Sequence, residues 1–201
     1  MILREEIIKT LQKDPVMKKI LANAKKEVMV KESTDDCFQS LYETIIYQQL
    51  SGKAASSILR KFLTLFPEGK VTPKDVLAKS EEELASAGIS RQKRGYLYSL
   101  AEKFLDGTIT PEKFGSMSDE EIITELVQIK GIGPWSAQMY LMFTLGREDV
   151  FAPDDLGLRK AIQVNYNLTE LPKPKEAEKI AEQWKPYRTW ASLLLWKSIE
   201  G

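Results

Sequence analysis

Few residue types in this 201-residue chain could do chemistry. There is no histidine, and Cys37 is the single cysteine. These counts exclude a Ser-His-Asp triad, a Cys-His nucleophile, a zinc deaminase site, an internal disulfide and a cysteine-ligated iron–sulfur cluster. Catalysis must then use aspartate, glutamate, lysine, tyrosine or an ion with oxygen ligands. The pair Asp154-Asp155 stands at the start of an expected helix, where a carboxylate is favoured in its ionised form. The alternative to a catalytic role is that this pair merely caps the helix.

A second informative segment is the turn Lys130-Gly131-Ile132-Gly133-Pro134. Glycine allows the backbone that a tight turn between helices needs, and Pro134 suits the first position of the next helix. We expect Ile132 to tuck inward and hold the two helices together. Backbone N–H groups beside the positive end of a helix can bind a phosphate, and the candidates are Gly131, Ile132, Gly133 and Ser136. The alternative is an ordinary tight turn with no ligand.

The turn and the carboxylate together resemble the helix-hairpin-helix DNA glycosylase superfamily. Asp155 follows Gly133 by 22 positions, close to the spacing at which these enzymes carry their essential aspartate. The wording Val-Phe-Ala-Pro-Asp-Asp is closest to the 3-methyladenine DNA glycosylase II group, and the resemblance implies that Asp155 is the catalytic residue. It further implies that backbone carbonyls of the hairpin hold a structural Na⁺ or K⁺, here those of Val127, Ile129 and Ile132. No cofactor is expected for catalysis.

The activity implied by this resemblance is excision of alkylated purines, such as 3-methyladenine and 7-methylguanine, from double-stranded DNA. A fixed carboxylate stabilises the positive charge that develops on the sugar. An alkylated base already carries positive charge and leaves without a general acid, so the missing histidine is no obstacle. Bifunctional relatives carry a Schiff-base lysine two residues after the second glycine of the hairpin. Trp135 stands there, so we expect an abasic site without strand cleavage.

A flipped, cationic base needs aromatic faces for stacking and cation–π attraction. The C-terminal run Trp184-Lys185-Pro186-Tyr187-Arg188 resembles a segment of the same group, in which the tryptophan matching Trp196 stands across the pocket. We expect Trp196 and Trp135 to line the pocket, with the hydrophobic core as the alternative for each. Trp184 and Trp190 are expected to pack in the core.

The segment Ile45-Ile46-Tyr47-Gln48-Gln49-Leu50-Ser51 resembles a turn that relatives use as a wedge, filling the gap left by the flipped nucleotide. Gln49 or Leu50 is the candidate wedge. Tyr47 and Gln48 are expected to face the base. The alternative is a polar turn in which Gln48 bonds to backbone.

Apolar residues recur at helical spacing throughout, and no strand is convincing, because the best candidate, residues 28–30, is short. The chain is therefore expected to be all-α, with about ten helices. The expected helices span 2–11, 38–46, 51–65, 80–88, 91–105, 118–129, 134–145, 155–164, 174–184 and 186–199.

The resemblance implies a compact form of the group, without the β-rich N-terminal domain of larger relatives. We expect a middle lobe, residues 37–147, that carries the hairpin. A second lobe would combine residues 1–36 with residues 148–201, and the active site would lie in a cleft between the two helical lobes.

Net charge is zero, with 29 basic and 29 acidic residues, and local basic runs such as residues 91–94 are expected to be solvated helix faces. No apolar run is long enough to cross a bilayer. We expect a cytoplasmic monomer, associated with the nucleoid if the source is bacterial.

Two other functions stay open: a non-catalytic helix-hairpin-helix module that binds DNA or senses damage, and a glycosylase for mismatched or oxidised bases. Asp155 argues against the first, and Trp135 with the missing cluster argues against the second.

Overall fold

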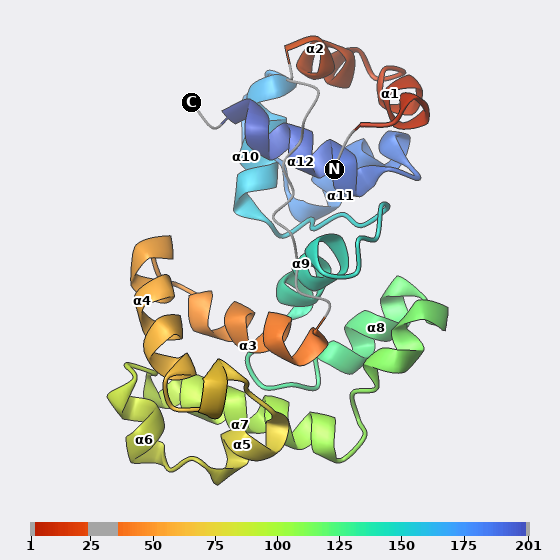
Figure 1. The fold of residues 1–201 in the computed structure, drawn as a ribbon. Helices are drawn as coiled ribbons and strands as arrows, with labels where there is room; N and C mark the ends of the chain where they lie inside the picture. The colour runs from red at the N-terminus through yellow and green to blue at the C-terminus, as the bar shows by residue number, and fades with distance from the viewer. Residues whose placement is uncertain (1–2, 24–35, 200–201) are drawn as a thin grey trace. The chain divides into compact units, whose positions relative to one another are not determined.

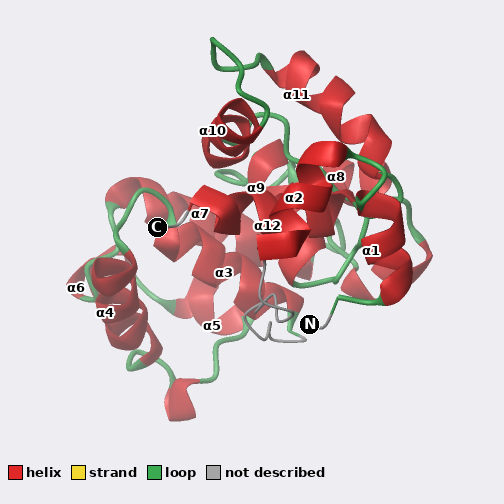
Figure 2. Ribbon diagram, turned by 90° about the horizontal axis from the view of Figure 1, so that it is seen from above, coloured by secondary structure: helices red, strands yellow, loops and turns green. Residues whose placement is uncertain are grey.

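The computed structural model describes residues 3–23 and 36–199, and this part of the chain consists of helices joined by turns and loops (Figure 2). No strand occurs among the described residues, which confirms the all-α class. The short strand candidate at residues 28–30 lies outside them. The chain divides into two compact units, Ser33–Tyr140 and the combination of Met1–Glu32 with Leu141–Gly201.

The unit Ser33–Tyr140 is built around the long helix α7 (Arg91–Leu105), which packs against α3, α5 and α6 (Figure 1). Its side chains Leu97 and Leu100 are fully buried. The other elements are α3 (Cys37–Tyr47), α4 (Gly52–Leu63), η1 (Pro67–Gly69), α5 (Pro73–Ala78), α6 (Glu81–Ser86), η2 (Pro111–Ser116) and α8 (Asp119–Leu126). Helix α9 (Pro134–Phe143) begins in this unit.

The other unit joins the two ends of the described chain. Its elements are α1 (Glu5–Leu11), α2 (Pro15–Asn23), α10 (Leu156–Asn165), α11 (Pro174–Ala181), η3 (Glu182–Trp184) and α12 (Arg188–Ile199). The buried carboxylate of Asp14 fastens them, because it accepts hydrogen bonds from the Val16 backbone N–H at 2.8 Å, from the Trp184 indole at 2.9 Å and from the Tyr166 hydroxyl. A buried carboxylate with three donors is satisfied and fixes the segments that carry them.

Two helices, α2 and α5, were missed by the sequence prediction, which ended the first helix at Leu11 and expected none at residues 15–23 or 73–78. Asp14 caps α2, and Pro15 occupies its first position, so this pair begins a helix. The division between the units falls at residues 33 and 140, whereas the expected lobe spanned residues 37–147. Phe143 of α9 stacks on Trp196 of α12, and both belong to the unit that contains Leu141–Gly201.

Candidate active site and DNA-binding elements

Two donors hold the carboxylate of Asp155 at the start of α10. Asp155 is the N-cap residue, and its Oδ1 accepts the backbone N–H of Leu158 at 2.6 Å. The indole N–H of Trp196 donates to the same oxygen at 2.9 Å. The residue is half-buried. The helix capping expected of the Asp154-Asp155 pair is thus present, and the carboxylate has a fixed orientation.

The surroundings of this carboxylate are tightly filled. The ring of Trp196 stacks on Phe143, with 6.2 Å between centroids and 28° between the planes. A Cβ atom added to Gly157 would lie 3.1 Å from Asp155 Oδ1 and 3.2 Å from Trp196 Nε1. Position 157 therefore has room for glycine but not for a side chain, unless the hydrogen-bonded pair moves.

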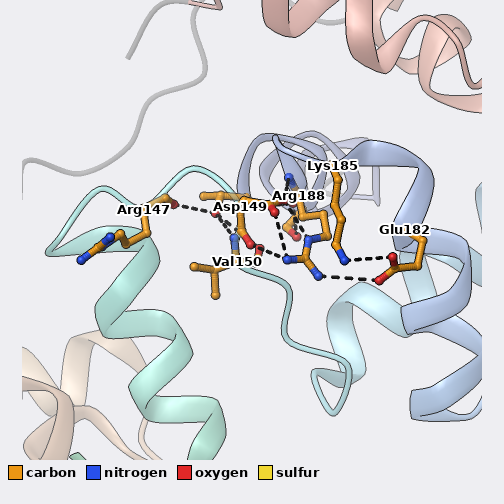
Figure 3. Close-up of polar contacts among 8 residues, drawn as sticks. Arg147, Asp149, Val150, Glu182, Lys185 and Arg188 are labelled. Atoms are coloured by element: carbon orange, nitrogen blue, oxygen red, sulfur yellow. Dashed lines mark hydrogen bonds and ion pairs between the residues drawn. The ribbon is translucent and has the colours of Figure 1, made fainter. Parts of the chain in front are cut away.

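A planar ion pair fastens the chain that leads to Asp155 onto the start of α12 (Figure 3). The guanidinium of Arg188 contacts both carboxylate oxygens of Asp149, through Nε at 2.8 Å and Nη2 at 3.0 Å. Nη2 also donates to the Asp149 backbone carbonyl at 2.9 Å. This geometry uses the fork of donors that arginine has and lysine lacks.

The neighbouring side chain on α12 completes the attachment. The hydroxyl of Thr189 donates to the Arg147 carbonyl at 2.7 Å and accepts the Val150 N–H at 3.0 Å. The Thr189 N–H donates to the Glu148 carbonyl at 3.0 Å, and the Trp190 indole donates to the Glu148 carboxylate at 3.0 Å. Helix α12 thus holds residues 147–150 near its start and Asp155 near its end.

Of the two glycines in the hairpin between α8 and α9, Gly131 has the expected left-handed backbone, whereas Gly133 has no positive φ. Gly131 has φ +86°, and a Cβ added there would lie 2.2 Å from the ring of Tyr96, so only glycine fits. Ile132 is 3% exposed and packs inward, as expected. Its N–H donates to the Ile129 carbonyl at 3.0 Å, so this N–H has an acceptor within the hairpin, and its contact with a phosphate stays a prediction.

Two of the other phosphate candidates, Gly133 and Ser136, lie at the start of α9, and Gly131 lies in the turn before it. The first hydrogen bond inside this helix runs from the Ala137 N–H to the Gly133 carbonyl at 3.0 Å. The Ser136 N–H precedes that bond, at a position where helix geometry offers no intrahelical acceptor. Ser136 is only 5% exposed and Gly133 is exposed, so contact with a phosphate would be made mainly through backbone N–H groups.

The predicted cation ligands are backbone carbonyls at the end of α8 and in the hairpin. Val127 is the C-cap residue of α8 and is 39% exposed. The Ile129 carbonyl accepts the Ile132 N–H, which uses one of its two lone pairs. The donor set is composed of neutral oxygens, which fits Na⁺ or K⁺ rather than a transition metal.

The turn between α3 and α4 presents two exposed side chains at its tip. Gln49 has φ +57° and is exposed, and Leu50 is 40% exposed. The amide of Gln48 donates to the Gly131 carbonyl at 2.8 Å, so the alternative in which Gln48 bonds to backbone is the one observed. The hydroxyl of Tyr47 lies 2.8 Å from that of Ser56 on α4, beside a pocket of about 400 Å³.

Two of the four tryptophans lie in the core, as expected, and the pocket-lining role of the other two stays a prediction. Trp184 and Trp190 are buried, at 0% and 3% exposure, and belong to the core. Trp135 is 43% exposed at the start of α9. Trp196 is half-buried beside Asp155. Of the predicted site residues, the structure thus brings Asp155 together with Trp196 in one unit, and Gln48 together with Gly131 in the other.

Sequence reasoning missed two cations that hold these segments. No role was predicted for Arg188 beyond its place in a motif, although it forms an ion pair with Asp149. Lys93 was expected on a solvated face, but its ammonium donates to the Ile46 and Gln48 carbonyls. Burial lowers the pKa of Lys93 below its ordinary value. The motif Trp-x-Pro-Tyr-Arg was the signal for the first, and nothing local marks the second.

The described residues contain no group of three or more Cys, Asp or Glu side chains placed to hold a metal ion. Within the same residues, every helix is too short or too polar to cross a membrane.

Comparison with known proteins places these features in a family. The family model for "HhH-GPD superfamily base excision DNA repair protein" matches residues 42–186. The Schizosaccharomyces pombe protein named DNA-3-methyladenine glycosylase 1 is 36% identical over 163 residues, which span 80% of this chain and 72% of that protein. A Bacillus subtilis relative is 32% identical, and the match spans 81% of this chain but only 59% of that protein. Among solved structures, the S. pombe 3-methyladenine DNA glycosylase in complex with abasic DNA has a TM-score of 0.85 at 31% identity, with 96% of each chain covered.

Proposed function

This chain belongs to the HhH-GPD superfamily of base excision DNA repair proteins, and we propose that it is a monofunctional glycosylase that excises alkylated purines from DNA. The names of its relatives support this substrate class. The observation that carries the proposal is the carboxylate of Asp155, held on one oxygen by Leu158 and Trp196. Helix capping accounts for the bond from Leu158, whereas the bond from Trp196 fixes the orientation of the carboxylate beyond what a cap needs.

The chemistry follows from the charge of the two partners. Breaking the N-glycosidic bond leaves positive charge on the deoxyribose, and a carboxylate fixed before the reaction stabilises that charge without reorganising. Asp155 also orients and deprotonates the attacking water, whose oxygen forms the new bond to the sugar carbon. The bonding electrons leave with the base. In 3-methyladenine or 7-methylguanine the attached base carries a positive charge, so it departs as a neutral molecule and needs no proton from the protein.

Trp135 occupies the position at which bifunctional relatives carry a lysine nucleophile. An indole cannot form a Schiff base, so the product is an abasic site in an intact strand. Trp196 offers an aromatic face beside Asp155, suited to an electron-poor purine.

DNA is held through its backbone. The N–H groups at the start of α9 take a phosphate, while Gln49 or Leu50 enters the gap left by the flipped nucleotide. The carbonyls of Val127, Ile129 and Ile132 would hold a Na⁺ or K⁺ ion, which would add positive charge near the phosphate. Catalysis itself needs no cofactor, and the protein acts as a monomer on double-stranded DNA.

The test is release of free bases from DNA treated with a methylating agent, analysed by chromatography, with untreated DNA and DNA containing 8-oxoguanine as controls. We expect 3-methyladenine and 7-methylguanine from methylated DNA alone. The strand should break only after alkali, which cleaves abasic sites. Tight binding without release would indicate the non-catalytic module, and release of 8-oxoguanine would indicate the oxidised-base branch.

A further inference from the structure

The wedge turn, residues 48–51, is fastened to the hairpin, although 83 positions separate the two residues that join them. The Gln48 amide donates to the Gly131 carbonyl at 2.8 Å. We propose that Gln48 and Lys93 are positioning residues that lock the wedge turn to the phosphate-binding hairpin, so that the wedge enters DNA at a fixed offset from the phosphate that the hairpin grips. The inference rests on the proposed function and adds to it how flipping is achieved.

Lys93 supports the wedge turn through backbone carbonyls at the end of α3. Its ammonium donates to the Ile46 carbonyl at 2.7 Å and to the Gln48 carbonyl at 2.8 Å. These carbonyls lie at the C-terminal end of α3, where helix geometry leaves acceptors without partners and the helix dipole is negative. The Lys93 ammonium therefore supplies hydrogen-bond donors to carbonyls at the end of α3, where the chain leaves the helix.

One face of α7 carries the contacts to both segments. Lys93 reaches the end of α3, and the ring of Tyr96 fills the space that a Cβ at Gly131 would need. The hydroxyl of Ser99 accepts the Lys130 N–H at 3.1 Å. These three residues recur at intervals of three and share one helix face. The wedge turn and the hairpin thus stand on the same rigid element.

The tip of the wedge turn has a strained backbone, as expected if it holds the wedge side chain in one position. Gln49 adopts φ +57°, which costs a non-glycine residue on the order of 1 kcal/mol. Such a conformation persists only where the surroundings determine it, and it is found often at functional sites. The Gln48 side chain bonds to the Gly131 carbonyl, and the Gln48 carbonyl accepts a bond from Lys93. These two bonds fix the backbone before Gln49, while Gln49 and Leu50 stay exposed at the tip.

The test uses two variants that remove a donor and keep the shape, Gln48→Met and Lys93→Met. Matched controls are Gln39→Met, whose amide bonds to Glu43 within α3, and Lys103→Met, which pairs with Asp106 at the end of α7. Each is measured by single-turnover excision of 7-methylguanine in two duplexes. In one the lesion faces cytosine, and in the other it faces an abasic analogue that costs little to flip. A 2-aminopurine beside the lesion reports unstacking by fluorescence.

We expect Gln48→Met and Lys93→Met to slow excision opposite cytosine by about tenfold. Excision opposite the abasic analogue should change little, and the fluorescence rise should be smaller. Equal slowing on both duplexes, or an unchanged fluorescence rise, would overturn the inference, as would controls that behave like the variants. If the wild-type protein excises the base from neither duplex, the proposed function fails. The fluorescence rise of the variants, compared with that of wild type, still tests whether the bonds of Gln48 and Lys93 are needed for unstacking. If one variant does not fold, the other carries the test.

Discussion

The indole Nε1 of Trp196 lies 2.9 Å from Oδ1 of Asp155, so a residue on α12 orients a carboxylate that begins α10. The same helix holds Asp149 through Arg188 at its start. The segment from Asp149 to Asp155 is therefore attached to one helix at both ends. Because the proposed chemistry depends on the position of a single charge, we expect activity to respond to changes at these attachments.

Replacing Trp196 by phenylalanine removes the N–H donor and keeps an aromatic ring near Phe143. Hydrogen bonds to charged groups contribute about 1.5–3 kcal/mol, so we expect excision to slow by roughly ten- to a hundredfold. Single-turnover kinetics on a 7-methylguanine duplex measures this, with Val164→Ala at an exposed position of α10 as the control. A phenylalanine variant as fast as wild type would show that the hydrogen bond does not matter.

Adding a methyl group at Gly157 should separate activity from stability. Alanine avoids the helix penalty of glycine, about 1 kcal/mol, so the melting temperature should not fall. The new Cβ would lie 3.1 Å from Asp155 Oδ1 and should displace the carboxylate, slowing excision by about tenfold.

The matched control is Gly95→Ala in α7, where an added Cβ meets no atom within 4 Å. It should keep full activity. Equal excision rates for the two alanine variants would mean that the position of the carboxylate is not critical.

Substitution of Arg188 by lysine should destabilise the protein more than loss of an exposed ion pair. Lysine cannot contact both oxygens of Asp149. The side chain of Arg188 is 19% exposed, and we expect the free energy of unfolding in urea to fall by about 1–3 kcal/mol. The control, Lys185→Ala, breaks a contact with Glu182 between two half-exposed side chains and should cost below about 1 kcal/mol. If both variants lose a similar free energy of unfolding, the two-point contact between the Arg188 guanidinium and Asp149 has no special role.

The thiol of Cys37 should be unreactive in the folded protein. Burial raises the pKa of Cys37 from 9.0 to about 12, so the nucleophilic thiolate is scarce near neutral pH. Because the folded pKa exceeds the unfolded one, this group's contribution to stability is complete below pH 9.0 and is lost as the pH rises toward about 12. Iodoacetamide should label the chain in urea but not the native protein. Native labelling at the unfolded rate would contradict this.

Local signals in the sequence predicted the elements that depend on neighbouring residues. The pattern of Ser80 followed by Glu83 is typical of a capping box, and both of its hydrogen bonds are present. The capping role of the Asp154-Asp155 pair and the inward packing of Ile132 were predicted in the same way. Such features depend only on interactions among a few consecutive residues, which can be identified from the sequence alone.

Features that join distant segments could not be predicted. The partner of Arg188 lies 39 positions away, and Lys93 reaches carbonyls 45 and 47 positions away. A single sequence does not identify which carbonyl a lysine will meet, so Lys93 was assigned to solvent. For Gln48, both a base-facing role and a backbone bond fitted the sequence, and only the fold separates them.

The most direct test of the central claim is the single-turnover rate of Asp155→Asn on a duplex with one 7-methylguanine. Asparagine is a good N-cap and keeps an oxygen for Leu158 and Trp196, so the variant should fold and bind abasic DNA, while the negative charge is lost. We predict that excision falls at least about a hundredfold, the loss typical when one preorganised stabilising group is removed. An Asp155→Asn protein that releases the base at the wild-type rate would contradict the account.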